Sequence, residues 1–237
     1  MDGVLGNVFD AALWATYGPR MLAGLWVTLV LVAISYSLGM VLGLLLAFAR
    51  LSRWRILRCV SATYCWLMRG SPLLAQLFLL YYGLGSLREF WQDWGLWWFF
   101  RDAWYCALLA FSLNTAAYQA EIFRGSFLAI PAGQQEAAMA LGLSRWARWC
   151  KVTLPQSLMV AIGPLGNELI LLIKASALAS LVTVYDVMGI AKLAFSRSFD
   201  FQVYLWAAVL YLLIVETLRR LLRVVERRLN RHLDSPG

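Results

Sequence analysis

The sequence has 237 residues, of which 62% are hydrophobic and 14% are charged. Soluble domains are typically about 45–50% apolar and about 25% charged, so this composition excludes an ordinary water-soluble globular protein. The net charge of +8 would suit a nucleic-acid partner in a polar chain. In so apolar a chain the positions of the charges are more informative than their sum, and we expect no nucleic acid to bind.

Five apolar segments are long enough to cross a membrane, which takes about 20 residues in a helix. Their approximate bounds are 21–49, 59–87, 103–122, 158–182 and 201–218. Spans and connectors together use nearly all of the sequence, which leaves no room for a separate soluble domain. The sequence therefore predicts a single transmembrane domain over residues 1–237, an all-α integral membrane protein in contact with lipid.

Basic residues are distributed unevenly between the two sides of these spans. Fourteen of the 21 Lys and Arg residues lie between spans one and two, between spans three and four, or in the tail. The positive-inside rule therefore predicts a multi-pass protein with its N-terminus outside and its C-terminus in the cytoplasm. The first 20 residues lack a basic region and a clear cleavage site, so we expect no removed signal peptide. Within the spans only Arg69 and Lys174 are basic.

The sequence offers little for catalysis or metal binding. Its four cysteines, Cys59, Cys65, Cys106 and Cys150, have neither the spacing of a metal site nor the density of a disulfide framework, and we interpret them as buried apolar side chains. The histidine His232 lies in the predicted tail, and no GxSxG motif occurs. These absences argue against a serine–histidine intramembrane hydrolase, and no catalytic residue or metal ligand is predicted.

Small residues recur every four positions in the first span, at Ser35, Gly39 and Gly43. Such a stripe predicts close approach of another helix. Aromatic residues crowd the connector between the second and third spans, as is typical of a membrane–water boundary, with a ligand-binding aromatic box as the alternative.

The connector at residues 131–155 predicts two short helices separated by a break. Pro131 marks the start, Gly142 is expected to adopt the left-handed conformation that ends the first helix, and Ser144 is expected to cap the second. Glu136 is expected in the first turn, where the helix dipole favours an anion. The alanines that follow have almost no side chain, so the first helix can press its backbone against a partner.

This connector resembles the EAA signature of ABC importer permease subunits. The matching residues are Glu136-Ala137-Ala138, Gly142 and Val152-x-Leu154-Pro155. Two further motifs extend the resemblance over most of the chain, RGSPL at 69–73 and NTAAYxxEIFRG at 114–125, and both resemble the polar amino-acid subfamily. Together with the five-span layout, the segment 167–178 is most similar to permeases for histidine, lysine, arginine, ornithine and the opines.

The resemblance implies a type I ABC importer permease in a bacterial inner membrane. Its implied partners are a second permease subunit, a cytoplasmic ATPase dimer that binds ATP and Mg, and an extracytoplasmic amino-acid-binding protein. The chain lacks the GxxxxGK[ST] phosphate loop, so we expect it to be a transport subunit without a cofactor of its own. The residues implied to couple it to the ATPase are Glu136, Ala137, Ala138, Gly142 and Pro155.

Glu168 is the strongest candidate for substrate binding. A charged side chain at the bilayer centre costs about 3 kcal/mol on insertion scales, so it is retained where it faces a partner or a water-filled cavity. Gly163, Pro164 and Gly166 precede it, which predicts an interrupted helix of the kind that lines transport sites. We interpret Glu168 as the acceptor of a cationic substrate group; the alternative is a structural ion pair.

Three other residues join Glu168 in the candidate substrate site. Asn167 fits helix packing and substrate binding equally well, Arg69 could attract a substrate carboxylate or serve a gate or packing role, and Ser176 belongs to the same family segment. Lys174 is interpreted as structural. Many relatives carry Asp where this chain has Ala175, and the missing carboxylate favours a paralogous second permease over a homodimer.

The favoured function is ATP-driven import of a polar, basic amino acid or opine by alternating access. The alternatives are a passive channel, an exporter, and a permease of the same family for a neutral or acidic amino acid. A channel does not need a short cytoplasmic helix of the EAA type. A dependence of transport on ATP would distinguish the ATP-driven permeases from a passive channel.

Overall fold

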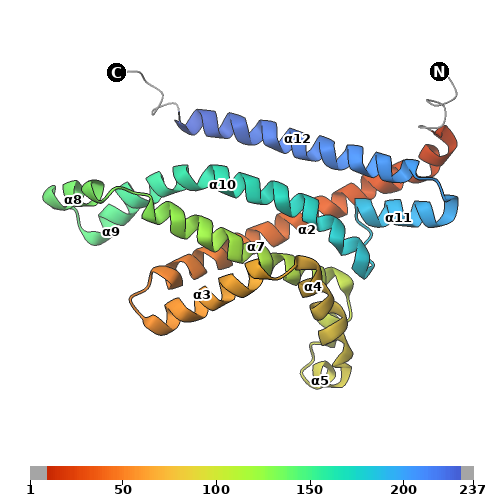
Figure 1. The fold of residues 1–237 in the computed structure, drawn as a ribbon, viewed down its shortest axis with the longest axis horizontal. Coiled ribbons are helices and arrows are strands. Elements are labelled where there is room, and N and C mark those ends of the chain that lie inside the picture. Colours follow the sequence, from red (N-terminus) through yellow and green to blue (C-terminus); the bar gives the residue numbers. More distant parts are fainter. Residues whose placement is uncertain (1–9, 231–237) are drawn as a thin grey trace. The chain divides into compact units, whose positions relative to one another are not determined.

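The computed structural model describes residues 10–230, and in this range all regular secondary structure is helical (Figure 1). The predicted all-α fold is therefore confirmed. His232 and both chain ends lie outside the described residues. The helices are α2 (Ala11–Leu51), α3 (Arg55–Gly70), α4 (Leu73–Phe78), η1 (Leu79–Gly83), η2 (Leu84–Ser86), α5 (Arg88–Asp93), α6 (Trp97–Phe100), α7 (Ala103–Leu128), α8 (Ala132–Ala140), α9 (Arg145–Arg148), η3 (Trp149–Thr153), α10 (Leu154–Ala175), η4 (Ser176–Val182), α11 (Val187–Ser198) and α12 (Gln202–Asn230).

Two helical segments among the described residues are apolar and long enough to cross a membrane on their own. They are Ala11–Leu51 and the run Arg145–Val182, with a shorter apolar run at Leu73–Ser86. Helix α7 has 26 residues and is about 39 Å long, enough to span, but it carries buried polar side chains that lower its hydropathy. The five-span layout stays a prediction.

The helices depart from the sequence expectations in three places. Segment 59–87 is interrupted at Ser71–Pro72, because a proline has no N–H to donate and disfavours helical geometry in the residue before it. Helix α10 runs unbroken through Pro164, so the predicted interruption before Glu168 is wrong. Helix α11 lies between the fourth and fifth predicted spans, where no element was expected.

The described residues form two compact units. Unit 1 contains 10–37, 71–112 and 171–216, and unit 2 contains 38–70, 113–170 and 217–230. The core of unit 1 joins the beginning of α2 to α11 and α12, through residues that include Met21, Val187 and Val203, all fully buried. In unit 2, small and aromatic residues of α2, α7 and α10 pack together, among them Ala47, Phe123 and Ala161.

The small-residue stripe of α2 works as predicted within unit 2. A Cβ atom at Gly39 would collide with the Thr115 methyl group, and one at Gly43 would lie 2.9 Å from the Ala116 carbonyl oxygen. Because Ala116 presents backbone to this contact, the neighbour cannot move aside as a flexible side chain would. The absence of a side chain at these glycines therefore lets α2 lie directly against α7.

We expect Gly43→Ala to lower the free energy of unfolding by about 1–3 kcal/mol through overpacking, although alanine has the higher helix propensity. Gly125 of α7 is the matched control, since nothing lies within 4 Å of the position that an added methyl group would take there. Gly125→Ala should therefore leave stability unchanged or raise it. Thermal unfolding of both variants in one detergent measures the difference, and equal shifts in the two would contradict the close approach of α2 and α7.

Asp186 stabilises the start of α11 in unit 1. It is fully buried; its Oδ1 accepts a hydrogen bond from the Gly189 N–H at 2.7 Å, and its Oδ2 accepts one from the Tyr211 hydroxyl at 3.0 Å. Burial penalises the charged form and raises the pKa of Asp186 to about 6, although both hydrogen bonds oppose the shift.

Asp186 should therefore make the protein more stable at pH 5 than at pH 7.5. Between about pH 4 and pH 6 the Asp186 carboxyl group of the folded protein keeps a proton that the unfolded chain has released. The contribution of this group to the free energy of unfolding is therefore full below about pH 4 and is lost as the pH rises through the pKa of the folded state. Asp186→Asn keeps an acceptor at the helix start and should flatten this dependence in thermal unfolding. The exposed cap Asp102 provides the control, as Asp102→Asn; an unchanged pH dependence in Asp186→Asn would refute the assignment.

Candidate substrate site and coupling loop

Glu168 lies on α10 and is buried in unit 2, with 7% of its surface exposed. Its Oε1 accepts a hydrogen bond of 2.9 Å from the hydroxyl of Thr115, a fully buried residue of α7. Among the described residues Glu168 forms no ion pair. One neutral hydrogen bond does not replace the hydration of a carboxylate, so the site is suited to a cationic ligand.

Arg69 lies in the last turn of α3, in the same unit as Glu168, and its side chain is exposed. Its guanidinium carbon is 5.3 Å from the centre of the Tyr118 ring on α7. The end of α3 is held on α7 by a 2.9 Å hydrogen bond from the Asn114 side chain to the Met68 carbonyl oxygen. Arg69 interacts electrostatically with Glu168 without pairing to it, so one unit presents both a cation and an anion.

The other two predicted substrate residues have different surroundings. Asn167 is exposed on α10, and its side chain makes no hydrogen bond with the described residues, so the amide remains available to a ligand. Ser176 is fully buried in unit 1, where its hydroxyl donates to the Ile173 carbonyl oxygen at 2.7 Å. That bond uses the Ser176 donor at the junction between α10 and η4. Lys174 is exposed at the end of α10.

Three residues of α7 near Glu168 and Arg69 were not predicted from the sequence as part of the site: Asn114, Thr115 and Tyr118. These residues follow one another on α7 at helical spacing, and Gln119 lies one turn after Thr115. A polar stripe along an otherwise apolar helix marks a face that contacts protein or water rather than lipid. That periodicity was present in the sequence and would have marked this face of α7 as one that contacts protein or water, without identifying α10 as its partner.

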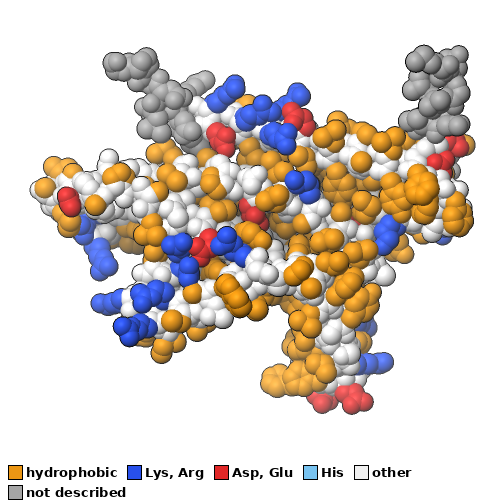
Figure 2. All heavy atoms as spheres, in the orientation of Figure 1, with side chains coloured by type: hydrophobic (Ala, Val, Ile, Leu, Met, Phe, Trp, Pro, Cys, Tyr) orange, Lys and Arg blue, Asp and Glu red, His pale blue; other side chains and the backbone are white. Residues whose placement is uncertain are grey.

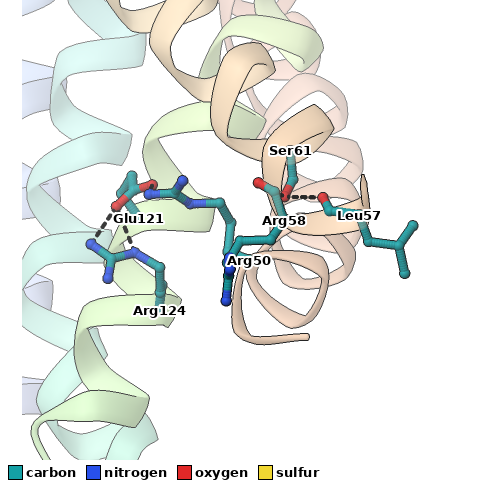
Figure 3. Close-up of polar contacts among 6 residues, drawn as sticks. All are labelled: Arg50, Leu57, Arg58, Ser61, Glu121 and Arg124. Atoms are coloured by element: carbon teal, nitrogen blue, oxygen red, sulfur yellow. Dashed lines mark hydrogen bonds and ion pairs between the residues drawn. The ribbon is translucent and has the colours of Figure 1, made fainter. Parts of the chain in front are cut away.

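An ion-pair cluster lies further along α7 (Figure 3). Glu121 sits between two arginines: Arg50 of α2 contacts Oε1 at 2.9 Å, and Arg124 contacts Oε2 through two nitrogens at 2.7 and 2.8 Å. The Glu121 side chain is 15% exposed, which shields the pairs from water. This cluster joins the end of α2 to α7. The connector at residues 131–155 begins three residues after α7 ends, and we call it the coupling loop.

The coupling loop is built largely as the sequence predicts. Gly142 has φ of +72° and lies just after α8, the first of the two short helices. The Ser144 hydroxyl accepts a hydrogen bond from the Ala147 N–H and caps α9, the second. Glu136 is not in the first turn, contrary to expectation. Helix α8 begins directly after Pro131, so Glu136 is its fifth residue, beyond the free N–H groups of the helix start.

The predicted coupling residues occupy different positions on this loop. Glu136, Ala137, Gly142 and Pro155 are exposed, whereas Ala138 is buried. Large apolar side chains also face outward: Met139 is 51%, Leu141 is 80% and Trp146 is 74% exposed. Exposed apolar side chains beside exposed small ones form a surface suited to a protein partner.

Aromatic packing joins this loop to the long helices of unit 2. The Trp149 ring lies 5.6 Å from that of Phe48 on α2 and 5.1 Å from that of Phe127 on α7. The Gln135 side chain donates to the Thr153 hydroxyl, which ties α8 to η3. The loop therefore contacts α2 and α7 directly, and η3 continues into α10.

Comparison with known proteins identifies the class of this membrane protein. The chain belongs to the family of inner membrane components of binding-protein-dependent transport systems, which matches residues 39–231. It is thus a permease subunit of an ABC importer, as its EAA loop implied.

Individual relatives match over nearly the whole chain. The nopaline transport system permease protein NocM of Agrobacterium fabrum is 39% identical, over 92% of this chain and 90% of its own. The octopine transport system permease protein OccM of Rhizobium radiobacter is 38% identical, over 96% of each chain. The crystal structure of an amino acid ABC transporter with histidines superposes with a TM-score of 0.82 at 31% identity, covering 93% of this chain and 99% of the other.

Proposed function

We propose that this permease carries a cationic amino acid or an opine into the cytoplasm by alternating access. The observation that carries the proposal is the buried carboxylate of Glu168, which has the Thr115 hydroxyl as a partner but no ion pair among the described residues. A cationic substrate would supply the missing counter-charge. The resemblance to nopaline and octopine permeases supports this chemistry, because both opines are derivatives of arginine and contain a guanidinium group.

Arg69 supplies the complementary charge in the proposed site. A free amino acid and an opine both carry at least one carboxylate beside the cationic group. The exposed guanidinium of Arg69 can bind that carboxylate while Glu168 binds the cation. The exposed amide of Asn167, next to Glu168, can add a neutral hydrogen bond.

We propose that ATP binding and hydrolysis by the ATPase are coupled to transport through the coupling loop. ATP and Mg would bind to a cytoplasmic ATPase dimer, and Glu136, Ala137, Gly142 and Pro155 would lie in or beside its contact with the loop, with Ala138 fixing α8 from behind. Closure of the ATPase would then move Trp149 and its contacts on α2 and α7. This arrangement requires the N-terminus outside and the C-terminus in the cytoplasm, the orientation that the basic residues favour.

The other proposed partners are a second permease and a binding protein. Ala175 leaves this subunit without a carboxylate that many relatives have, so a paralogous second permease would complete a site for a basic side chain. An extracytoplasmic binding protein would deliver the substrate on the opposite side from the coupling loop.

Nucleotide-dependent uptake tests the proposal. The full complex is reconstituted in proteoliposomes with its ATPase, second permease and binding protein, and uptake of labelled arginine, octopine and glutamate is measured with and without ATP. We expect uptake of arginine or octopine that requires ATP. Uptake without nucleotide would show a channel instead, and a preference for glutamate would overturn the proposed substrate class.

A further inference from the structure

A groove of about 690 Å³ lies beside the coupling loop in unit 2. One wall is Phe48, near the end of the long apolar helix α2. The lining also includes Gln135 of α8 and, in and around α9, Arg145, Trp146 and Arg148. The groove is therefore lined both by α2, which is long and apolar enough to span a membrane, and by the coupling loop.

The charge in this groove is positive and unbalanced. Arg145 and Arg148 line it, no acidic residue does, and neither arginine forms an ion pair with the described part of the chain. The Nε of Arg148 is buried and has no acceptor among the described residues. Arg50 and Arg124, in contrast, both form ion pairs with Glu121, although the Nε of Arg50 also lacks an acceptor among the described residues. A guanidinium group that has a buried N–H without an acceptor and also lacks an ion pair, as Arg148 does among the described residues, indicates a site for an anion.

The aromatic lining indicates what kind of anion fits. Trp146 is 74% exposed, and Phe48 is 42% exposed on α2, so the groove offers apolar surface beside its two cations. Tryptophan and arginine together are typical of the membrane interface, where the ring meets acyl chains and the guanidinium meets phosphate. Within unit 2, Lys and Arg side chains gather at the end that carries the α2–α3 connector and α8–α9 (Figure 2).

We propose that this groove binds an anionic phospholipid, with the phosphate held between Arg145 and Arg148 and the acyl chains along Phe48 and Trp146. Arginine binds phosphate through paired N–H groups, which would satisfy the buried donor of Arg148. A lipid is favoured over an acidic peptide because one wall belongs to α2, a helix long and apolar enough to cross the membrane. The proposal does not depend on the transported substrate.

Native mass spectrometry of the full-length permease in detergent tests this site. The protein is titrated with phosphatidylglycerol and with phosphatidylcholine of the same acyl chains, and bound lipids are counted. We expect an apparent affinity for phosphatidylglycerol that is about tenfold higher, and Arg148→Gln should lower it about tenfold, the effect of losing one desolvated cation–phosphate contact. Arg145→Gln, at an exposed position, should lower it by a smaller factor and keeps the test valid if Arg148→Gln fails to fold.

Arg53→Gln is the matched control, because Arg53 is an exposed arginine in the α2–α3 connector and does not line the groove. Its affinity for phosphatidylglycerol should equal that of the wild type. Equal binding of the two lipids, or an equal loss in Arg53→Gln, would overturn the proposal. Displacement of bound phosphatidylglycerol when the ATPase is added would assign the groove to that partner instead.

Discussion

Glu168→Gln is expected to reduce ATP-driven uptake of a cationic amino acid by about 100-fold. The variant would remove the protein's member of the proposed charge pair between Glu168 and the substrate, and losing one member of a buried charge pair costs about 2–5 kcal/mol. Glutamine has nearly the same shape and keeps an oxygen to accept the 2.9 Å hydrogen bond from Thr115, so the packing of α10 on α7 should survive. The variant therefore removes charge and little else. Glu168→Asp keeps the charge at a shorter reach and should transport at an intermediate rate.

Initial uptake rates in proteoliposomes measure this effect, with the amount of assembled complex determined in parallel. Glu89→Gln is the control, since it removes an exposed carboxylate from α5 and should leave uptake unchanged. Wild-type uptake of a cationic substrate by Glu168→Gln would refute the proposed role of this residue. A loss of assembled complex equal to the loss of uptake would assign Glu168 to structure instead.

Gly142→Val is expected to lower both association with the ATPase and ATP-driven transport by at least about tenfold. A side chain in the left-handed conformation costs about 1–2 kcal/mol, and a β-branched residue tolerates it least. Relief of that strain would change the turn between α8 and α9, where φ is now +72°. The exposed residues of α8 would then be presented to the partner at a different angle.

Gly95 separates this effect from strain in general. It has φ of +68° in the connector between α5 and α6, and nothing lies within 4 Å of either glycine's Cβ position. Gly95→Val should therefore suffer similar strain while keeping the ATPase bound. Co-purification with the ATPase and uptake assays compare the two variants, and equal losses in both would show that the turn at Gly142 has no specific part in coupling.

Local chemistry made much of the coupling loop predictable. Gly142 and Ser144 act through their own backbone and nearest neighbours, so their roles follow from sequence. The predicted place of Glu136 was wrong by one residue: α8 begins directly after Pro131, so its first turn is residues 132–135 and Glu136 follows it.

Contacts between distant segments explain what the sequence did not predict. Gly163, Pro164 and Gly166 suggested an interrupted helix, yet α10 is continuous, and a Cβ atom added at Gly166 would lie 2.8 Å from the Leu222 side chain on α12. These glycines give room to a neighbouring helix. The same limit applies to the substrate site, where Thr115 and Glu168 are 53 residues apart. Their pairing depends on how α7 and α10 pack, which single-sequence patterns do not specify.

ATP hydrolysis by the reconstituted complex, measured across a panel of ligands, tests the central claim most directly. The complex contains this permease, its ATPase, its second permease and its binding protein, and the panel contains arginine, lysine, histidine, ornithine, octopine and neutral amino acids. We predict that the cationic and opine ligands alone stimulate hydrolysis, and that Glu168→Gln removes the stimulation while basal turnover stays. Stimulation by neutral amino acids, or turnover that responds to no ligand, would contradict the account.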